Sequence, residues 1–214
     1  VGGRFESIQY DYTNNMNVGR VREDGTQCGF GGCRYSRPAD SENDFHNFSP
    51  KLSLRYQLNP QTQLFGGIAR GYRAPQATEL YRLQRAQTVT DLDSVTADNI
   101  EMGVTGTLFD GSYTLSLYSL QKDNVIYRDS DFFNVSNGET WHRGVELTFD
   151  QPLSDVLRLD FAGTYAKHTY EHSQLSGEQD IKGNDIDTAP KLQFNARLSF
   201  EMSSKVQTQL EWQH

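Results

Sequence analysis

The feature that most constrains the fold of this chain is an alternation of apolar and polar residues, repeated in stretches of about ten residues. From Lys51 to Leu58 the even positions are Leu, Leu, Tyr and Leu, whereas the odd positions are Lys, Ser, Arg and Gln. The stretch from Lys191 to Glu201 repeats the arrangement. Because successive side chains of a strand point to opposite faces, each stretch predicts a strand with one apolar and one polar face.

The connections between these stretches are alternately short and long. Turn signals such as Asp110-Gly111 follow every second strand, and long polar connections, such as 14–47 and 74–98, follow the others. A phase slip near Glu6 predicts a bulge in the first strand, and Pro75 to Gln84 predicts a turn or two of helix. The nine expected strands run over residues 1–13, 48–58, 62–73, 99–109, 112–128, 140–149, 156–170, 190–201 and from 205 onward.

Short turns at one end and long loops at the other are typical of an outer-membrane barrel, whose turns are periplasmic and whose loops are external. The predicted fold is therefore all-β: an antiparallel, up-and-down transmembrane β-barrel fragment. Residues 1–214 are expected to form part of a single barrel domain, because the chain begins and ends inside expected strands. Nine strands would also leave two open edges, whereas bacterial single-chain barrels are closed and have an even number of strands.

Composition agrees with a barrel and argues against nucleic acid as a partner. Mean hydropathy is −0.69, yet the chain carries 11 Tyr and 12 Phe. That combination is expected when half of each strand faces water and aromatic rings gather at the membrane interfaces. The formal net charge is −8, and no stripe of Lys and Arg is available to neutralise phosphates. No hydrolase signature is present, so we expect neither catalytic residues nor a cofactor.

Two cysteines, Cys28 and Cys33, frame a Gly-rich segment of the first long connection. Their spacing allows a small disulfide ring, which would indicate an oxidising compartment. Two reduced surface thiols are the alternative, and a zinc site is disfavoured because no second Cys pair or nearby His pair accompanies them. We favour the disulfide.

Three local patterns resemble those of TonB-dependent outer-membrane receptors. The first resembles a segment in which a strand ends in an external loop, and the other two resemble the openings of later strands of that family. The patterns are Gly71-Tyr72-Arg73-Ala74-Pro75 with Glu79-Leu80-Tyr81, then Asn99-Ile100-Glu101-Met102-Gly103, then Asn134 followed by Gly144-Val145-Glu146. Glu101 and Glu146 are out of phase with their apolar neighbours, so both are expected to face the barrel lumen.

The resemblance implies energy-coupled uptake of a scarce nutrient across the bacterial outer membrane. The implied ligand is a ferric siderophore or a similar metal chelate, and the other implied partners are the lipid bilayer and the TonB complex. Contact with TonB would run through an N-terminal plug, for which we find no segment in this chain. A passive porin-type barrel and a soluble β-sandwich binding domain are the alternatives.

A group of cationic and aromatic residues falls near the expected outer rim. Such side chains could grip an anionic iron chelate, although the tyrosines could instead belong to the interfacial aromatic belt. The candidate ligand-binding residues are Arg70, Tyr72, Arg73, Tyr81 and Arg82, with Arg85 beside them.

Metal-binding patterns are weak. His168 and His172 are expected at the upper end of a strand, where solvated loop-end histidines are favoured over metal capture. Asp91, Asp93 and residues 184–187 offer oxygen atoms at calcium-like spacing, but without a complete calcium loop. We therefore expect acidic external loops and no metal site.

Overall fold

The computed structural model describes residues 1–29, 33, 35–84, 87–176, 179–203 and 205–214. Nine strands form one antiparallel sheet in the order β1-β2-β3-β4-β5-β6-β7-β10-β11, as the sequence predicts. A two-stranded hairpin, β8–β9, and one short helix, α1, lie in the connections. No helix in the described part of the chain is long and apolar enough to cross a membrane. The elements are β1 Gly2–Tyr12, β2 Ser41–Asn59, β3 Thr62–Arg73, α1 Ala77–Tyr81, β4 Val95–Leu108, β5 Gly111–Arg128, β6 Asn134–Ser154, β7 Leu157–Tyr170, β8 Leu175–Ser176, β9 Gln179–Asp180, β10 Leu192–Ser203 and β11 Val206–Gln213.

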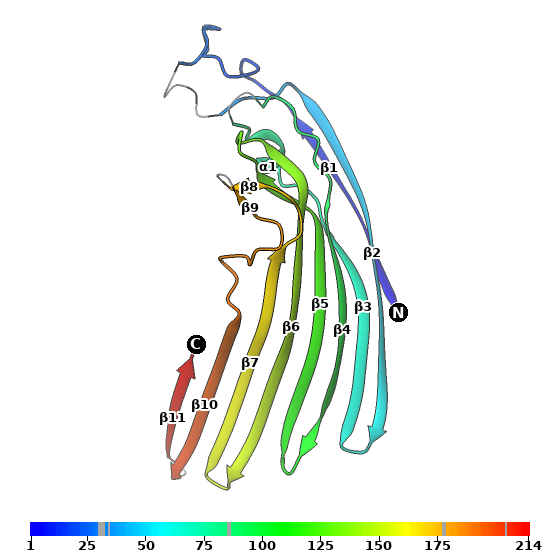
Figure 1. The fold of residues 1–214 in the computed structure, drawn as a ribbon, viewed down its shortest axis with the longest axis vertical. Coiled ribbons are helices and arrows are strands. Elements are labelled where there is room, and N and C mark those ends of the chain that lie inside the picture. The colour runs from blue at the N-terminus through cyan, green and yellow to red at the C-terminus, as the bar shows by residue number, and fades with distance from the viewer. Residues whose placement is uncertain (30–32, 34, 85–86, 177–178, 204) are drawn as a thin grey trace.

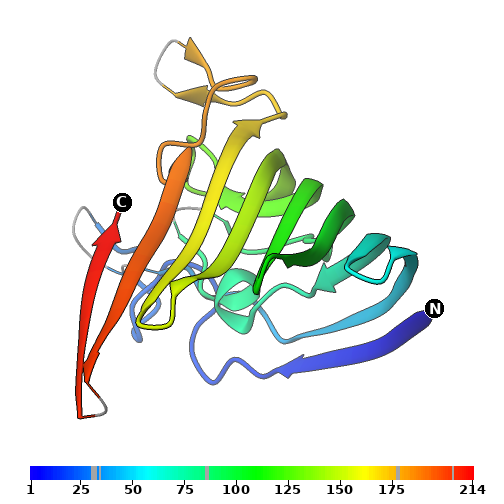
Figure 2. The same cartoon turned by 90° about the horizontal axis from the view of Figure 1, so that it is seen from below.

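The strands form a single curved layer with its short turns at one end (Figure 1). The turns β2–β3, β4–β5, β6–β7 and β10–β11 all lie there, and the longer connections lie at the opposite end. Seen from below, the layer bends into an open arc (Figure 2). This is the asymmetry of short turns and long loops that the sequence predicts.

One face of the sheet is apolar because the register aligns the apolar residues of neighbouring strands. Leu117 lies opposite Met102 on β4 and opposite Val145 on β6. Across the next two strands, Val145 lies opposite Tyr165 and Tyr165 opposite Leu192. We call this surface the apolar face. The opposite surface, which carries Glu101, Glu146 and Arg197, is the polar face.

The apolar face is uncovered. Leu54 and Leu210, for example, are 73% and 70% exposed. Apart from Pro38 and Pro75, the buried apolar side chains among the described residues are Ala74, Leu80, Leu83, Leu92 and Ala166, and all but Ala166 belong to the connection between β3 and β4. A β-sandwich would bury its apolar face against a second sheet. Here that face has no second layer among the described residues, and an uncovered apolar face is typical of the lipid-facing side of a membrane barrel.

Several strands are longer than the alternation predicts. β2 begins at Ser41 instead of residue 48, β4 begins at Val95 instead of residue 99, and β6 extends from Asn134 to Ser154 instead of 140–149. The added residues sit mostly beyond the apolar band, where both faces of a strand are polar and the alternation disappears. Backbone pairing continues there without that signal, as in the pair Tyr12–Ser41.

The bulge predicted near Glu6 is wrong. β1 pairs with β2 from Gly2 to Tyr12 without a shift in register. The apparent change of phase has the same cause as the strand extensions. Phe5 shares its face with Ser7 and Gln9, so the outward residues of β1 become polar above Phe5 while the pairing stays regular.

Candidate functional site

The short helix α1 is fixed to the polar face of β1 and β2. The ring of Tyr81 stacks on Tyr12 with the ring centroids 4.4 Å apart, and its hydroxyl donates to Asn43 Oδ1 at 2.9 Å. The hydroxyl of Tyr10 donates to the carbonyl oxygen of Pro75 at 3.0 Å. These contacts hold the start of the β3–β4 connection against the inner side of the wall.

The motif around Pro75 explains how the chain turns from β3 into α1. Glu79 accepts a hydrogen bond from the backbone N–H of Gln76 at 2.7 Å, which satisfies a free donor at the start of the helix. The same carboxylate pairs with Arg73 at 2.8 Å. Leu80 is 1% exposed, and the burial of its side chain anchors the helix. Arg73, Glu79 and Leu80 therefore shape this external connection.

Asn134 ties the start of β6 to the same connection. Its side-chain amide donates to the carbonyl of Glu79 at 2.8 Å. Its backbone N–H donates to Gln87 Oε1 at 2.9 Å, and Gln87 Nε2 donates to the carbonyl of Asn134 at 3.0 Å. Asn134 and Gln87 are both buried, so these polar groups need their partners. Two connections that are distant in sequence are thereby held as one unit.

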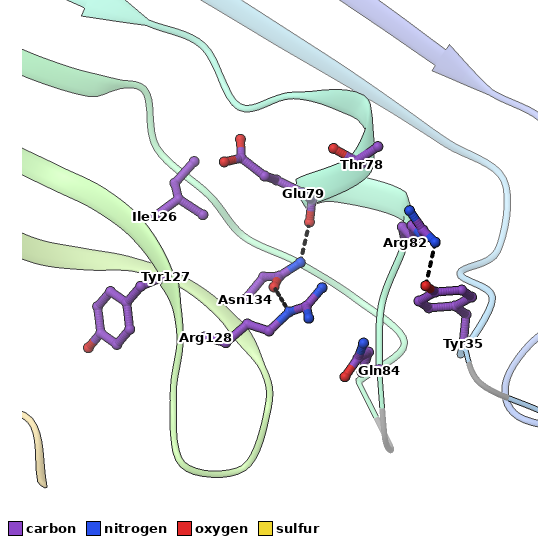
Figure 3. Close-up of a pocket in the computed structure, with 9 residues that line it drawn as sticks. All are labelled: Tyr35, Thr78, Glu79, Arg82, Gln84, Ile126, Tyr127, Arg128 and Asn134. Atoms are coloured by element: carbon purple, nitrogen blue, oxygen red, sulfur yellow. Dashed lines mark hydrogen bonds between the residues drawn. The ribbon is translucent and has the colours of Figure 1, made fainter. Parts of the chain in front are cut away.

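A cavity of about 490 Å³ opens between these connections (Figure 3). It is polar, with two guanidinium groups and two phenol rings among its lining side chains. Arg82 lies over the ring of Tyr35 at 4.3 Å and hydrogen-bonds its hydroxyl. Arg128 donates to Asn134 Oδ1 at 3.2 Å. The lining residues are Tyr35, Thr78, Glu79, Arg82, Gln84, Ile126, Tyr127, Arg128 and Asn134.

The lining favours an anionic, oxygen-rich ligand. Arg82 and Arg128 supply fixed positive charge, whereas the one carboxylate of the lining, Glu79, is neutralised by Arg73. Guanidinium groups bind oxyanions through several N–H donors in one plane. The tyrosine rings add flat apolar surface with a polar edge.

The structure brings only part of the predicted cluster to this cavity. Arg82 lines it, and Tyr81 and Arg73 support it through the contacts described above. Arg70 lies on the outward surface of the sheet, where Asp98 holds it in a two-pronged ion pair at 2.5 Å and Tyr72 hydrogen-bonds it. Arg85 lies outside the described residues. The ligand-binding roles of these residues stay predictions.

No sequence pattern predicts three of the residues that line the cavity. Tyr35 belongs to a loop without periodicity, and Tyr127 and Arg128 end a strand whose neighbours are fixed only by folding. The position of Arg70 outside the lumen, in contrast, could have been predicted from its phase in the strand. This residue shares a face with Ile68, which aligns with apolar Leu52 and Ile100 on the neighbouring strands.

The motif glycines on β4 and β6 make room for aromatic rings on the polar face. A Cβ at Gly103 would lie 2.5 Å from the ring of Phe65, and one at Gly144 would lie 3.0 Å from the ring of Tyr118. The same Cβ atoms would lie 2.4 Å from the carbonyl oxygen of Leu115 and 2.8 Å from that of Tyr165, so a neighbouring strand would have to shift. Glu101 and Glu146 lie on the same face, with cross-strand partners Tyr118 and Ser116. Nothing in the structure explains Gly71, whose surroundings are open.

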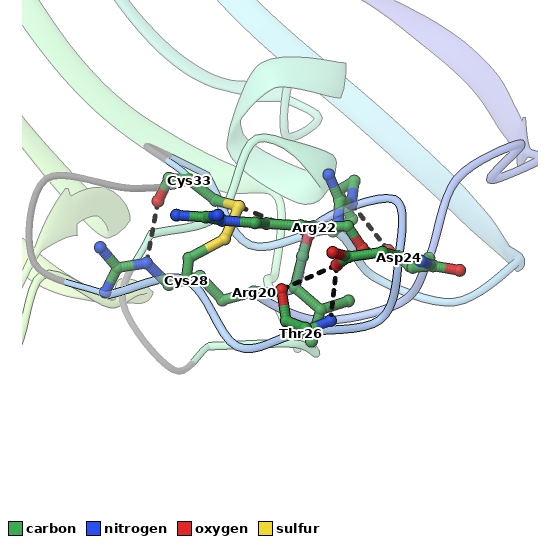
Figure 4. The surroundings of a disulfide bond; sticks show 9 residues. Arg20, Arg22, Asp24, Thr26, Cys28 and Cys33 are labelled. Carbon is green, nitrogen blue, oxygen red and sulfur yellow. Dashed lines mark hydrogen bonds between the residues drawn. A yellow bond between two sulfur atoms is a disulfide. The ribbon is translucent and has the colours of Figure 1, made fainter.

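Cys28 and Cys33 form a disulfide in the first external connection, with their Cα atoms 5.5 Å apart (Figure 4). Backbone and side-chain hydrogen bonds surround it: Cys28 N–H donates to the carbonyl of Arg20 at 3.1 Å, and Arg20 Nε donates to the carbonyl of Cys33 at 2.8 Å. Hydrogen bonds from Thr26 hold the pKa of the Asp24 carboxyl below its usual value. The disulfide and these hydrogen bonds hold Arg20, Cys28 and Cys33 together within this connection.

His168 and His172, which the sequence predicts to be solvated at the end of a strand, both have protein partners. His168 faces His142 on the neighbouring strand, with the two Nδ1 atoms 2.8 Å apart. His172 instead accepts a hydrogen bond from the backbone N–H of Glu139 at 3.0 Å. Among the predicted oxygen ligands, Asp185 pairs with Lys191 at 2.6 Å, and this ammonium lowers the pKa of the Asp185 carboxyl.

An uncovered apolar face, a polar face that carries docked loops, and short turns at one end define the wall of an outer-membrane β-barrel. Comparison with known proteins gives the family. Residues 1–213 match the family model described as "TonB dependent receptor-like, beta-barrel", and the chain belongs to the TonB-dependent receptors. Its location is the outer membrane of Gram-negative bacteria.

The relatives span a range of metal-related receptors. Over 197 residues the chain is 25% identical to the metal-pseudopaline receptor CntO of Pseudomonas aeruginosa, covering 89% of this chain and 24% of that protein. The chain thus spans about a quarter of that relative's length. In fold it is similar to the copper transporter OprC, with a TM-score of 0.70 and 15% identity over 99% of this chain and 32% of the other. It is also similar to the ferric-catecholate import receptor Fiu of E. coli K12, with a TM-score of 0.69 and 14% identity over 99% of this chain and 30% of the other.

Proposed function

We propose that this chain is part of the barrel wall of a receptor that takes up a metal chelate across the outer membrane, with a ferric siderophore as the expected ligand. Transport is energy-coupled through the TonB complex, which acts on a plug encoded outside this sequence. In this proposal the chain contributes external loops that select the ligand and a wall that faces the transport path.

The external cavity carries the proposal. Arg82 and Arg128 are the cations of its lining, and Tyr35 and Tyr127 are its aromatic rings. Ferric siderophores bind iron through anionic oxygen atoms, so a complex with net negative charge suits such a lining. The relatives, a metal-pseudopaline receptor and a copper transporter among them, support a metal chelate more broadly than iron alone.

The other two functions have less support. A passive porin does not need docked connections that close a cavity, and family membership favours a gated receptor. A soluble β-sandwich needs a partner layer for the apolar face, and the described residues supply none.

Uptake by intact cells tests the proposal. Cells that carry the complete receptor gene are given radiolabelled iron, nickel, zinc or copper as chelates, with and without a proton-gradient uncoupler. Gradient-dependent uptake of one chelate supports the receptor and identifies its ligand. Gradient-independent passage of many small solutes would instead establish a porin.

Matched arginine variants test the role of the cavity. Arg82→Gln and Arg128→Gln each remove a cation from the lining, whereas Arg70→Gln removes one from the outward surface. A hydrogen bond to a charged group is worth about 1.5–3 kcal/mol, which corresponds to roughly 10- to 150-fold in binding. We expect chelate binding to cells to weaken by this factor in each of the two cavity variants and to stay unchanged in Arg70→Gln. Equal binding by all three variants would exclude the cavity as the ligand site.

A further inference from the structure

We propose that His142 and His168 form a two-imidazole site for a divalent transition-metal ion on the inner wall of the barrel. The two residues are direct cross-strand partners on β6 and β7. Their ring centroids lie 5.0 Å apart, and the two Nδ1 atoms approach to 2.8 Å. The proposed site binds the ion itself, so it goes beyond chelate recognition in the external cavity and does not depend on it.

Both rings belong to the polar face. His142 is in phase with Gly144 and Glu146 along β6, whereas its neighbour Arg143 is in phase with apolar Val145. His168 has the same relation to its neighbour Lys167, the cross-strand partner of Arg143. The imidazoles therefore project toward the interior of the barrel, where water and solutes can reach them.

The separation of the two nitrogens suits one metal ion. Imidazole nitrogens bind such ions at about 2.0–2.1 Å, so two ligands at a right angle are about 2.9 Å apart, whereas tetrahedral ligands are about 3.3 Å apart. The observed 2.8 Å matches the right-angle arrangement of square-planar and octahedral ions. Cu(II) and Ni(II) favour that geometry and bind imidazole well.

The hydroxyl of Thr140 can support the tautomer of His142 that such a site needs. Without the ion, the 2.8 Å contact is a hydrogen bond with a proton on one of the two Nδ1 atoms, and the ion would displace that proton. Both Nδ1 atoms must be unprotonated to bind the ion, so the ring proton of each bound imidazole must sit on Nε2. Nε2 of His142 lies 2.9 Å from Oγ1 of Thr140, and Thr140 is 7% exposed. A buried hydroxyl oxygen that accepts this proton orients the ring, as the outer partners of metal-binding histidines commonly do.

The protein supplies two ligands and leaves the other positions open. Among the residues that the structure describes, no group of three or more His, Cys, Asp or Glu side chains is placed to hold a metal ion. Water or donor atoms of a bound chelate would complete the coordination. Lys122, the cross-strand partner of Thr140, acts electrostatically on His142 and opposes the positive charge of the ion. The site is thus suited to reversible binding.

Metal titration of the purified complete receptor in detergent tests the inference. The probes are copper(II) and nickel(II) salts alone, and the readouts are titration calorimetry and the electron paramagnetic resonance of bound Cu(II). The variants are His142→Gln, His168→Gln and Lys122→Met. The matched control is His46→Gln, because His46 lies on the outward surface beside Ser7.

The expected result is one Cu(II) with two nitrogen donors, present in the wild type and in His46→Gln. Each variant of the pair should weaken that site at least tenfold, and Lys122→Met should strengthen it. Unchanged binding in both histidine variants would overturn the inference, and so would a wild-type spectrum without two nitrogen donors, which needs no variant to fold. Because no uptake is measured, failure here is distinct from failure of the proposed transport function.

Discussion

Replacing Leu147 by arginine tests whether the apolar face meets lipid. Leu147 lies on β6 between Val145 and Phe149 in the outward phase, and its cross-strand partners are Leu115 and Gly163. It is 39% exposed, so an aqueous surface would accept a long charged side chain there. A bilayer would not.

The two environments predict losses in the free energy of unfolding that differ severalfold. An arginine at the middle of the lipid-facing band of a barrel costs about 2–4 kcal/mol, which is roughly 30- to 700-fold in the folding equilibrium. An exposed substitution in water typically changes stability by less than about 0.5 kcal/mol. The middle position of Leu147 within the apolar stretch of β6 favours the upper part of the first range.

The adjacent residue provides a matched control. Thr148 is exposed on the polar face, opposite Thr114 and Ala162, so Thr148→Arg introduces the same side chain on the other side of the same strand. Both variants of the complete receptor are folded into phospholipid vesicles and titrated with urea. We expect a loss of about 2–4 kcal/mol for Leu147→Arg and less than about 1 kcal/mol for Thr148→Arg. Equal losses would refute the assignment of the faces.

Three further predictions concern the external connections. Leu80→Ala removes a side chain that is 1% exposed, so docking of α1 should weaken by about 2–5 kcal/mol. Amide hydrogen exchange over 77–81 should then accelerate. Val89→Ala, at a site 76% exposed, should leave the exchange rates over 77–81 unchanged. Burial raises the pKa of Tyr81 above the unfolded value of about 10, so docking is fully stabilised below pH 10 and is lost as the pH rises through the raised pKa. The ultraviolet phenolate titration should lose this late step in Tyr81→Phe, and an identical curve would contradict the packing of the ring. Finally, the Cys28–Cys33 pair should react with maleimide, as judged by mass, only after reduction. Reduction should leave the midpoint of barrel unfolding unchanged, because the disulfide lies within one connection. A shifted midpoint would show that this connection supports the barrel.

The strands, their faces and the positions of the hairpins are determined by the sequence itself. Alternation with a period of two is a local property, because each residue's face follows from its neighbours along the strand. The hairpin signal between β4 and β5 is equally local, although the turn residues are Phe109 and Asp110, one position earlier than the predicted Asp110-Gly111, because Leu108 pairs with Gly111. The short helix after Pro75 is local as well. These signals suffice for the fold class and for the placement of Glu101 and Glu146 on the polar face.

The site and the strand ends depend on tertiary structure. Arg82 meets Tyr35 across 47 residues, and His142 meets His168 across 26, because the register of neighbouring strands and the docking of α1 bring them together. No local pattern encodes such contacts. Above the membrane the apolar band ends, so the alternation that marks a strand also ends, and only backbone pairing to a neighbour decides that β2 begins at Ser41. Local chemistry therefore fixes which side of each strand meets lipid, whereas pairing between distant segments decides which side chains share a site.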